Sequence, residues 1–263
     1  MIPKKIDEAE FVLVGIGEEF EEMNLLKDCP AYMKGIELWK KENAEWIIPA
    51  WREYCAKKIS NEVSEALNVL QNMIKDKNYF IVTTCIDSRF KEVEWKDQKI
   101  VMPCGDNEQV QCIAGCKEIL NTISNEQRRW MNDVFKRVYE GEKVSLSKEL
   151  SANKSLGECD LCHELLVLNN IYSENYNENG YLNQWNKYLK WLQGTVNRKL
   201  LVLELGVGMK FPSVIRWPFE KTVFFNKKAE LVRINEFLYQ MTEELAGKGI
   251  GIQKNAIEWL TDL

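Results

Sequence analysis

Two close pairs of cysteines could hold a metal ion in this chain: three residues separate Cys112 from Cys116, and two separate Cys159 from Cys162. Zinc takes four thiolates in a tetrahedron at about 2.3 Å each, and two short turns joined by a loop can deliver them. The pattern therefore favours a structural zinc site over four unrelated thiols. The other cysteines are scattered along the 263 residues, and we expect no signal peptide before them. We therefore expect reduced thiols and a cytoplasmic location.

A pair of glycines follows the first apolar run of the chain. Residues 11–14 (Phe-Val-Leu-Val) precede Gly15 and Gly17, where a nucleotide-binding α/β fold would turn from strand to helix. Glycine there lets the backbone approach a pyrophosphate, which a helix N-terminus then stabilises. Glutamates follow at positions 18, 19, 21 and 22. Two interpretations stay open: the acids repel a phosphate at this turn, or they complement the helix dipole of an empty site.

Two further polar clusters follow apolar runs. Thr-Thr-Cys-Ile-Asp at 83–87 comes after the run 79–82, and Pro-Cys-Gly-Asp at 103–106 comes after the run 99–102. Open α/β sheets bind their ligands at the carboxyl ends of the strands, so Cys85, Cys104 and two carboxylates could share a site there. The alternative is turn chemistry, because Asp and Gly also close loops.

The elements that must position these residues are predicted by the spacing of apolar side chains. Short runs that are mostly apolar are typical of strands buried on both faces of a parallel sheet; they occupy 11–14, 79–82, 99–102, 200–203 and 229–234. Helical patterns lie between them, which indicates an α/β doubly wound fold. The longest pattern, 35–75, contains Pro49, so we expect two helices there, with the tryptophans in the core. Residues 141–158 predict a surface connection between the cysteine pairs.

Composition excludes several classes of function. With 35 basic and 40 acidic residues, the net charge is −5, and no basic stripe is present to bind a nucleic acid. The longest apolar runs are far shorter than the roughly 20 residues that a membrane span needs. We therefore expect a soluble protein that binds neither nucleic acid nor membrane.

Together these pieces resemble the sirtuin family over nearly the whole chain. A Gly-x-Gly first turn, Thr-Thr-Cys-Ile-Asp at 83–87, two cysteine pairs and Arg-Ile-Asn at 233–235 correspond to landmarks of that family. A closer resemblance is to the bacterial macrodomain-linked sirtuins, which read TTNVD, TQGD, LELGVGMNTP and YPF. This chain has TTCID at 83–87, PCGD at 103–106, LELGVGMKFP at 203–212 and WPF at 217–219.

The resemblance implies a single domain over 1–263 with a Rossmann-like, mainly parallel sheet. A helical module at about 28–75 and an inserted zinc-binding module at about 107–168 would complete it. It also implies an NAD cleft at the strand ends, in which Asp87 holds the nicotinamide carboxamide. The residues expected to line that cleft are Gly15, Gly17, Thr84, Ile86, Asp87, Gly206, Gly208 and Asn235.

The chain departs from the family at the catalytic positions, which we expect to be Asp87, Cys85 and Cys104. Cys104 stands where sirtuins have a histidine base and the macrodomain-linked group has glutamine, and Cys85 replaces the asparagine that positions the ribose. A thiol acts as a base only when its pKa is lowered. We therefore expect transfer of ADP-ribose from NAD to a protein acceptor, because the acceptor supplies its own nucleophile.

Other functions remain as alternatives. The acidic run after Gly17 and the missing histidine and asparagine favour a catalytically impaired module that binds NAD, ADP-ribose or a partner protein. NAD-dependent protein deacylation is a second alternative. Chemistry centred on the thiols of Cys85 and Cys104 is a third.

Overall fold

The computed structural model describes residues 2–116, 120–153 and 156–263. Its larger lobe is built on a parallel sheet of strand order β3-β2-β1-β7-β8-β9. The strands are β1 (Phe11–Ile16), β2 (Asn78–Thr83), β3 (Ile100–Val101), β7 (Leu200–Leu205), β8 (Ala229–Asn235) and β9 (Gly249–Gln253). This order reverses direction between β1 and β7, as in doubly wound dinucleotide-binding sheets. The predicted α/β class is confirmed.

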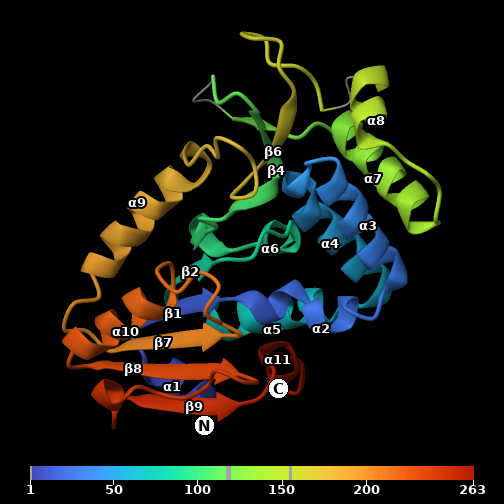
Figure 1. Ribbon diagram of the computed structural model, residues 1–263. Coiled ribbons are helices and arrows are strands. Elements are labelled where there is room, and N and C mark those ends of the chain that lie inside the picture. The colour runs from blue at the N-terminus through green and yellow to red at the C-terminus, as the bar shows by residue number, and fades with distance from the viewer. Residues whose placement is uncertain (1, 117–119, 154–155) are drawn as a thin grey trace.

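Helices cover both faces of this sheet, as Figure 1 shows. One face carries α1 (Ile2–Glu8), α5 (Glu62–Ile74) and α11 (Ala256–Thr261). The other carries α9 (Asn179–Gln193) and α10 (Arg216–Phe225). Val12 and Val14 of β1 enter the first core, while Leu13 between them enters the second. Because successive side chains of a strand point to opposite faces, a strand between two helical layers is apolar at nearly every position.

A second lobe has its own core. An antiparallel sheet of order β5-β4-β6 consists of β5 (Asn121–Thr122), β4 (Gly105–Cys112) and β6 (Leu166–Asn170). Around it lie α3 (Pro30–Lys41), α4 (Ile48–Ile59), α7 (Asn125–Tyr139) and α8 (Leu146–Asn153). Trp39, Trp51 and Phe135 pack together there, with ring centroids 5.4 to 6.2 Å apart. The tryptophans are therefore core residues, as predicted.

Short elements complete the chain. They are η1 (Glu18–Glu21), α2 (Met23–Leu26), η2 (Glu45–Ile47), α6 (Arg89–Glu92), η3 (Lys96–Gln98) and η4 (Glu243–Leu245). Of these, η1 and α6 follow directly on the turns after β1 and β2, so they carry side chains into the strand-end region.

Two predicted elements were wrong. Residues 35–75 do not form two helices: part of α3 and the whole of α4 and α5 lie there. Pro49 stands in the first turn of α4, where proline is tolerated. Residues 141–158 are more than a surface connection, because they include α8, whose Leu146 and Leu150 are buried.

The predicted modules meet in one core. Side chains of α3 and α4, from the expected helical module, pack with those of β4, β6 and α7, from the expected zinc module. Helix α5, which the helical module at about 28–75 includes, packs instead on the large sheet. Among the described residues, no helix has both the length and the apolar character needed to cross a bilayer.

Candidate functional site

The four paired cysteines converge in the second lobe. Cys112 ends β4 and Cys116 follows in a turn, while Cys159 and Cys162 lie in the turn that precedes β6. Their Sγ atoms all lie within 4.8 Å of one another, and four of the pairs are 3.2 to 3.5 Å apart. Tetrahedral zinc with bonds of about 2.3 Å needs sulfurs about 3.8 Å apart. The donor set and its spacing therefore fit one structural zinc ion.

Two turns meet at the switch point of the large sheet. Gly17, after β1, donates its N–H to Leu205 O at the end of β7, at 3.0 Å. A Cβ on Gly17 would lie 2.5 Å from Val207 Cα and 2.7 Å from Gly206 O, both backbone atoms. Only glycine permits this approach. The structure thus places the predicted Gly17, Gly206 and Gly208 in adjoining turns at one edge of the sheet. The predicted Gly15 lies instead inside β1, where a Cβ would come 2.5 Å from Ile215 Cγ2 and 2.8 Å from Phe219 Cε2.

The acidic run follows the first of these turns, and the contacts of its side chains show what the glutamates bind. Glu18 and Glu19 lie in η1 and make no cap to their own helix. Glu18 accepts from the N–H groups of Gly208 and Lys210, at 2.6 and 2.8 Å. Glu19 accepts from the N–H groups of Glu236 and Ala256, each at 2.7 Å. The carboxylates therefore bind backbone amides at the carboxyl ends of β7, β8 and β9.

The geometry of these amides tests whether the phosphates of NAD fit at the carboxyl ends of the strands. Four backbone N–H groups from three loops already hold two anionic groups, so their geometry suits anions such as phosphates. Gly206 and Gly208 lie directly under the carboxylates, because a Cβ there would come 2.6 Å from Glu19 Cβ and 3.0 Å from Glu18 Oε2. The amides fit the phosphates of NAD, and in this conformation the chain's own glutamates bind them.

Asp87 is buried at the end of the turn after β2, where it is held by Arg89. The guanidinium of Arg89 donates to both carboxylate oxygens of Asp87, at 2.6 to 3.0 Å, and forms an ion pair with Glu22 at 2.7 Å. Arg89 Nη1 and Glu22 Oε1 have no hydrogen-bond partner among the described residues. The cluster keeps unused polar atoms, which an incoming ligand could bind.

The two cysteines that we expected at catalytic positions carry protonated thiols. Cys85 is buried, and its Sγ donates to Gly17 O at 3.1 Å. Burial raises the pKa of Cys85, and it raises the pKa of Cys104 to about 12 although Lys210 opposes that shift. Neither thiol can serve as a base at neutral pH, because almost none of it is ionised there.

Asn235 shapes the loop after β8. Its Oδ1 accepts from the N–H groups of Phe237 and Leu238, at 2.9 and 2.7 Å, and its Nδ2 donates to Val207 O at 3.3 Å. This side chain therefore joins the turn after β8 to the turn after β7. The backbone N–H of Thr84 donates to Ile16 O at 3.1 Å, and this bond joins the turn after β2 to the end of β1.

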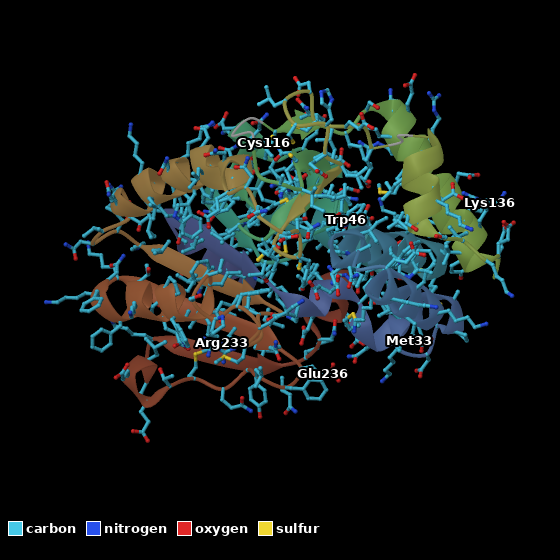
Figure 2. All side chains as sticks on the ribbon, turned by 45° about the horizontal axis from the view of Figure 1, so that its top comes forward. Met33, Trp46, Cys116, Lys136, Arg233 and Glu236 are labelled. Carbon is cyan, nitrogen blue, oxygen red and sulfur yellow. The ribbon has the colours of Figure 1, made fainter. Side chains whose placement is uncertain are left out.

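The structure thus brings the predicted cofactor residues to one edge of the large sheet, and the cysteines to a separate place. Figure 2 shows Cys116 on the opposite side of the molecule from Arg233 and Glu236. Sequence reasoning missed the buried cations Arg52 and Arg89, which pair with Glu21 and Glu22. The signal was present in the acidic run itself, because buried carboxylates need partners.

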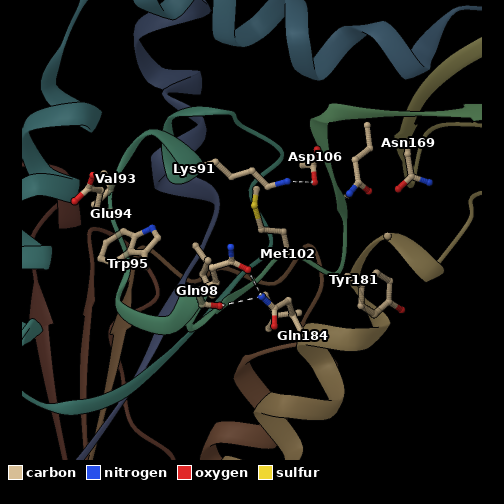
Figure 3. Close-up of a pocket in the computed structure, with 15 residues that line it drawn as sticks. Lys91, Val93, Glu94, Trp95, Gln98, Met102, Asp106, Asn169, Tyr181 and Gln184 are labelled. Atoms are coloured by element: carbon tan, nitrogen blue, oxygen red, sulfur yellow. Dashed lines mark hydrogen bonds and ion pairs between the residues drawn. The ribbon is translucent and has the colours of Figure 1, made fainter. Parts of the chain in front are cut away.

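A cavity of about 530 Å³ lies beside Gly105 and Asp106, at the edge strand β3. Figure 3 shows Lys91 paired with Asp106 across it, at 2.7 Å, and Gln184 in contact with Gln98. None of the predicted cofactor residues lines this cavity. It is therefore distinct from the strand-end region where the turns after β1 and β7 meet.

The chain matches no protein-family model. It is 20% identical over 276 residues to a protein ADP-ribosyltransferase of Staphylococcus aureus (strain Mu50), with 97% of this chain and 84% of the relative covered. Among solved structures, a Sir2 homolog in complex with NAD is similar over 99% of this chain and 90% of its own, with 12% identity and a TM-score of 0.56. A complex of Sir2 with a p53 peptide and NAD+ covers 99% and 95%, with 13% identity and a TM-score of 0.52. These likenesses confirm the resemblance to sirtuins at the level of the fold: this chain has the sirtuin fold.

Proposed function

We propose that this protein binds NAD at the carboxyl ends of β1, β7 and β8 and transfers ADP-ribose to a protein acceptor. The observation that carries the proposal is the set of backbone amides at Gly208, Lys210, Glu236 and Ala256, which converge on anionic groups beside the paired glycine turns. The similar Staphylococcus aureus protein, named a protein ADP-ribosyltransferase, supports the choice of reaction.

Different turns at the strand ends would bind different parts of NAD. The amides after β7 would hold the phosphates, and the loop that Asn235 shapes would hold the adenosine end. Thr84, Ile86 and Asp87, in the turn after β2, would hold the nicotinamide end. Bound NAD supplies an ADP-ribose group attached to nicotinamide, which is a good leaving group.

The residues present favour transfer over deacylation. The chain's one histidine, His163, lies in the turn between the second cysteine pair and β6, so no imidazole lies at the strand ends. Cys85 and Cys104 remain protonated at neutral pH. In transfer, the bond from the ribose to nicotinamide breaks, a bond to the acceptor's heteroatom forms, and the acceptor's proton passes to solvent. That reaction needs less from a base in the protein.

We also propose a structural role for zinc and a cytoplasmic location. Cys112 and Cys159 belong to the core of the second lobe, so a bound ion would tie β4 and the turn before β6 to that core. Reduced thiolates are the form that binds zinc, and the cytoplasm keeps them so.

The test uses NAD labelled in its adenylate moiety, with zinc-loaded wild-type protein, Asp87→Asn and the control Asp7→Asn. Asp7 is exposed and lies on α1. We expect nicotinamide release and labelled protein with the wild type and the control, and at least a tenfold loss with Asp87→Asn. Absence of both products from the wild type, together with no calorimetric binding of ADP-ribose, would overturn the proposal.

A further inference from the structure

Glu18 and Glu19 act together on loops that lie far away in the sequence. Glu18 bonds to two amides of the loop after β7, and Glu19 bonds to one amide after β8 and one after β9. All four distances are 2.6 to 2.8 Å, in the range of charge-assisted hydrogen bonds. Two adjacent side chains therefore accept hydrogen bonds from the backbone N–H groups of three loops at the edge of the sheet.

Each carboxylate uses both of its oxygens on a pair of N–H groups. Pairs of backbone N–H groups of this kind also bind phosphate oxygens. A carboxylate and a phosphate cannot occupy one pair of amides together, and their like charges also repel at this distance. A diphosphate therefore competes directly with Glu18 and Glu19 for the amides.

The segment that carries these side chains is held by ion pairs on its other side. Glu21 pairs with Arg52 at 3.0 Å and with Lys210 at 3.2 Å, and Glu22 pairs with Arg89 at 2.7 Å. Every glutamate of the run thus has partners outside the run. The segment ends at Glu22 with φ of 54°, a left-handed conformation that is uncommon for a residue with a side chain.

We propose that residues 18–22 form an autoinhibitory plug, which closes the anion site by placing Glu18 and Glu19 on its amides. This inference rests on the proposed NAD function and states how that same site is regulated. A ligand that carries a diphosphate, such as ADP-ribose, binds only after the two carboxylates leave. The affinity of the wild type is then reduced by the fraction of molecules in which the plug is open.

The experiment measures binding of ADP-ribose and of ADP by calorimetry to zinc-loaded protein. The test variant is E18Q/E19Q, because neutral amide side chains hold the backbone more weakly than carboxylates do. The matched control is E243Q/E244Q, an adjacent and exposed pair of glutamates in another short 3-10 helix, η4. We expect the test variant to bind both ligands at least tenfold more tightly than the wild type, and the control to bind them like the wild type.

A second variant distinguishes occupation of the backbone amides by the carboxylates from simple repulsion between the carboxylates and the ligand's phosphates. E18D/E19D keeps both negative charges but shortens each side chain by one methylene, so the carboxylates no longer reach the amides. Binding tighter than that of the wild type is expected for a plug. Binding as weak as that of the wild type, or weaker, would reduce the effect to repulsion and overturn the proposal.

The outcomes distinguish this inference from the function on which it rests. If E18Q/E19Q binds ADP no more tightly than the wild type, the plug is refuted, while nicotinamide release by the wild type would still support the function. If the variant binds ADP more tightly but no form of the protein cleaves NAD, the plug stands and the function fails.

A measurement on the wild type covers the case in which the variants do not fold. Amide hydrogen exchange is followed over residues 18–22 with and without saturating ADP-ribose. Faster exchange of that segment in the presence of the ligand is expected, because the segment must leave its partners. Unchanged or slower exchange there at saturation would refute the plug.

Discussion

Arg89 binds the carboxylate of Asp87 through Nε and Nη2, and both side chains are almost completely buried. The two residues are only two positions apart, so the turn after β2 positions both without help from a distant segment. The same guanidinium also faces Glu22 from the acidic run. Arg89 therefore links the turn that we expect to hold nicotinamide to the segment that we propose closes the cleft.

Loss of the Arg89 guanidinium should destabilise the fold strongly. Arg89→Met leaves Asp87 and Glu22 buried without their partner, and removing one member of a buried ion pair typically costs about 3 to 5 kcal/mol. Urea unfolding measures the difference from the wild type. Arg129→Met is the control, because Arg129 is exposed on α7. A loss below about 1 kcal/mol in Arg89→Met would show that the pair is not needed.

The thiol of Cys104 should be almost inert at neutral pH. Its pKa is raised to about 12 by burial, so only roughly one molecule in 10⁴ carries the thiolate at pH 8. Iodoacetamide should label Cys104 far more slowly in native protein than after unfolding in urea, with peptide mass spectrometry as the readout. The rate should rise about tenfold per pH unit up to pH 10. Rapid labelling at pH 7 would instead revive thiol chemistry at this position.

The same raised pKa predicts a pH dependence of stability. The folded state keeps the Cys104 proton up to a pH of about 12, while the unfolded chain releases it near the ordinary value of 9.0. The contribution of this thiol is therefore fully present below pH 9 and is lost as the pH rises towards 12. The free energy of unfolding of Cys104→Ala should fall less steeply than that of the wild type between pH 9 and 11. Parallel curves would contradict the burial of this thiol.

Zinc should be stoichiometric and should stabilise the second lobe. Cys116→Ser removes one of four thiolates, so we expect a lower zinc content by elemental analysis and a lower melting temperature. Cys29→Ser is the matched control, because Cys29 lies outside the cluster of four cysteines. Full zinc content in Cys116→Ser, or no zinc in the wild type, would contradict the assignment.

Gly17→Ala should disrupt the meeting of the turns after β1 and β7. The new methyl group would lie 2.5 Å from Val207 Cα, and backbone on both sides leaves little room to yield. Overpacking of this kind typically costs about 1 to 3 kcal/mol. Gly194→Ala at the end of α9 serves for comparison, since its nearest contact there is 3.1 Å. Equal stability of the two variants would argue against the close approach.

Much of the fold could be predicted from the sequence, because apolar runs and glycine turns are local features. The runs at 79–82 and 200–203 became β2 and β7, and Gly17 after β1 lies where the sheet reverses direction. Strands with weaker patterns were not predicted. For example, β9 contains two glycines and is only partly buried, so its sequence lacks the apolar continuity of the central strands.

In the candidate site, too, some features could be predicted from local sequence patterns and others could not. The cysteine spacing by itself predicted that these four thiols converge, because a tetrahedral ion restricts both the number and the separation of its ligands. The hydrogen-bond partners of Glu18 and Glu19 could not be predicted from the neighbouring sequence, because those partners lie about 190 to 237 residues away in the chain. Whether a carboxylate repels a phosphate, caps a helix or binds distant amides depends on which loops the fold brings to it. The sequence predicted the central strands and which four cysteines come together, because both are marked by local patterns. Only the tertiary structure decided which groups meet the charges of Glu18 and Glu19, because their partners lie far away in the chain.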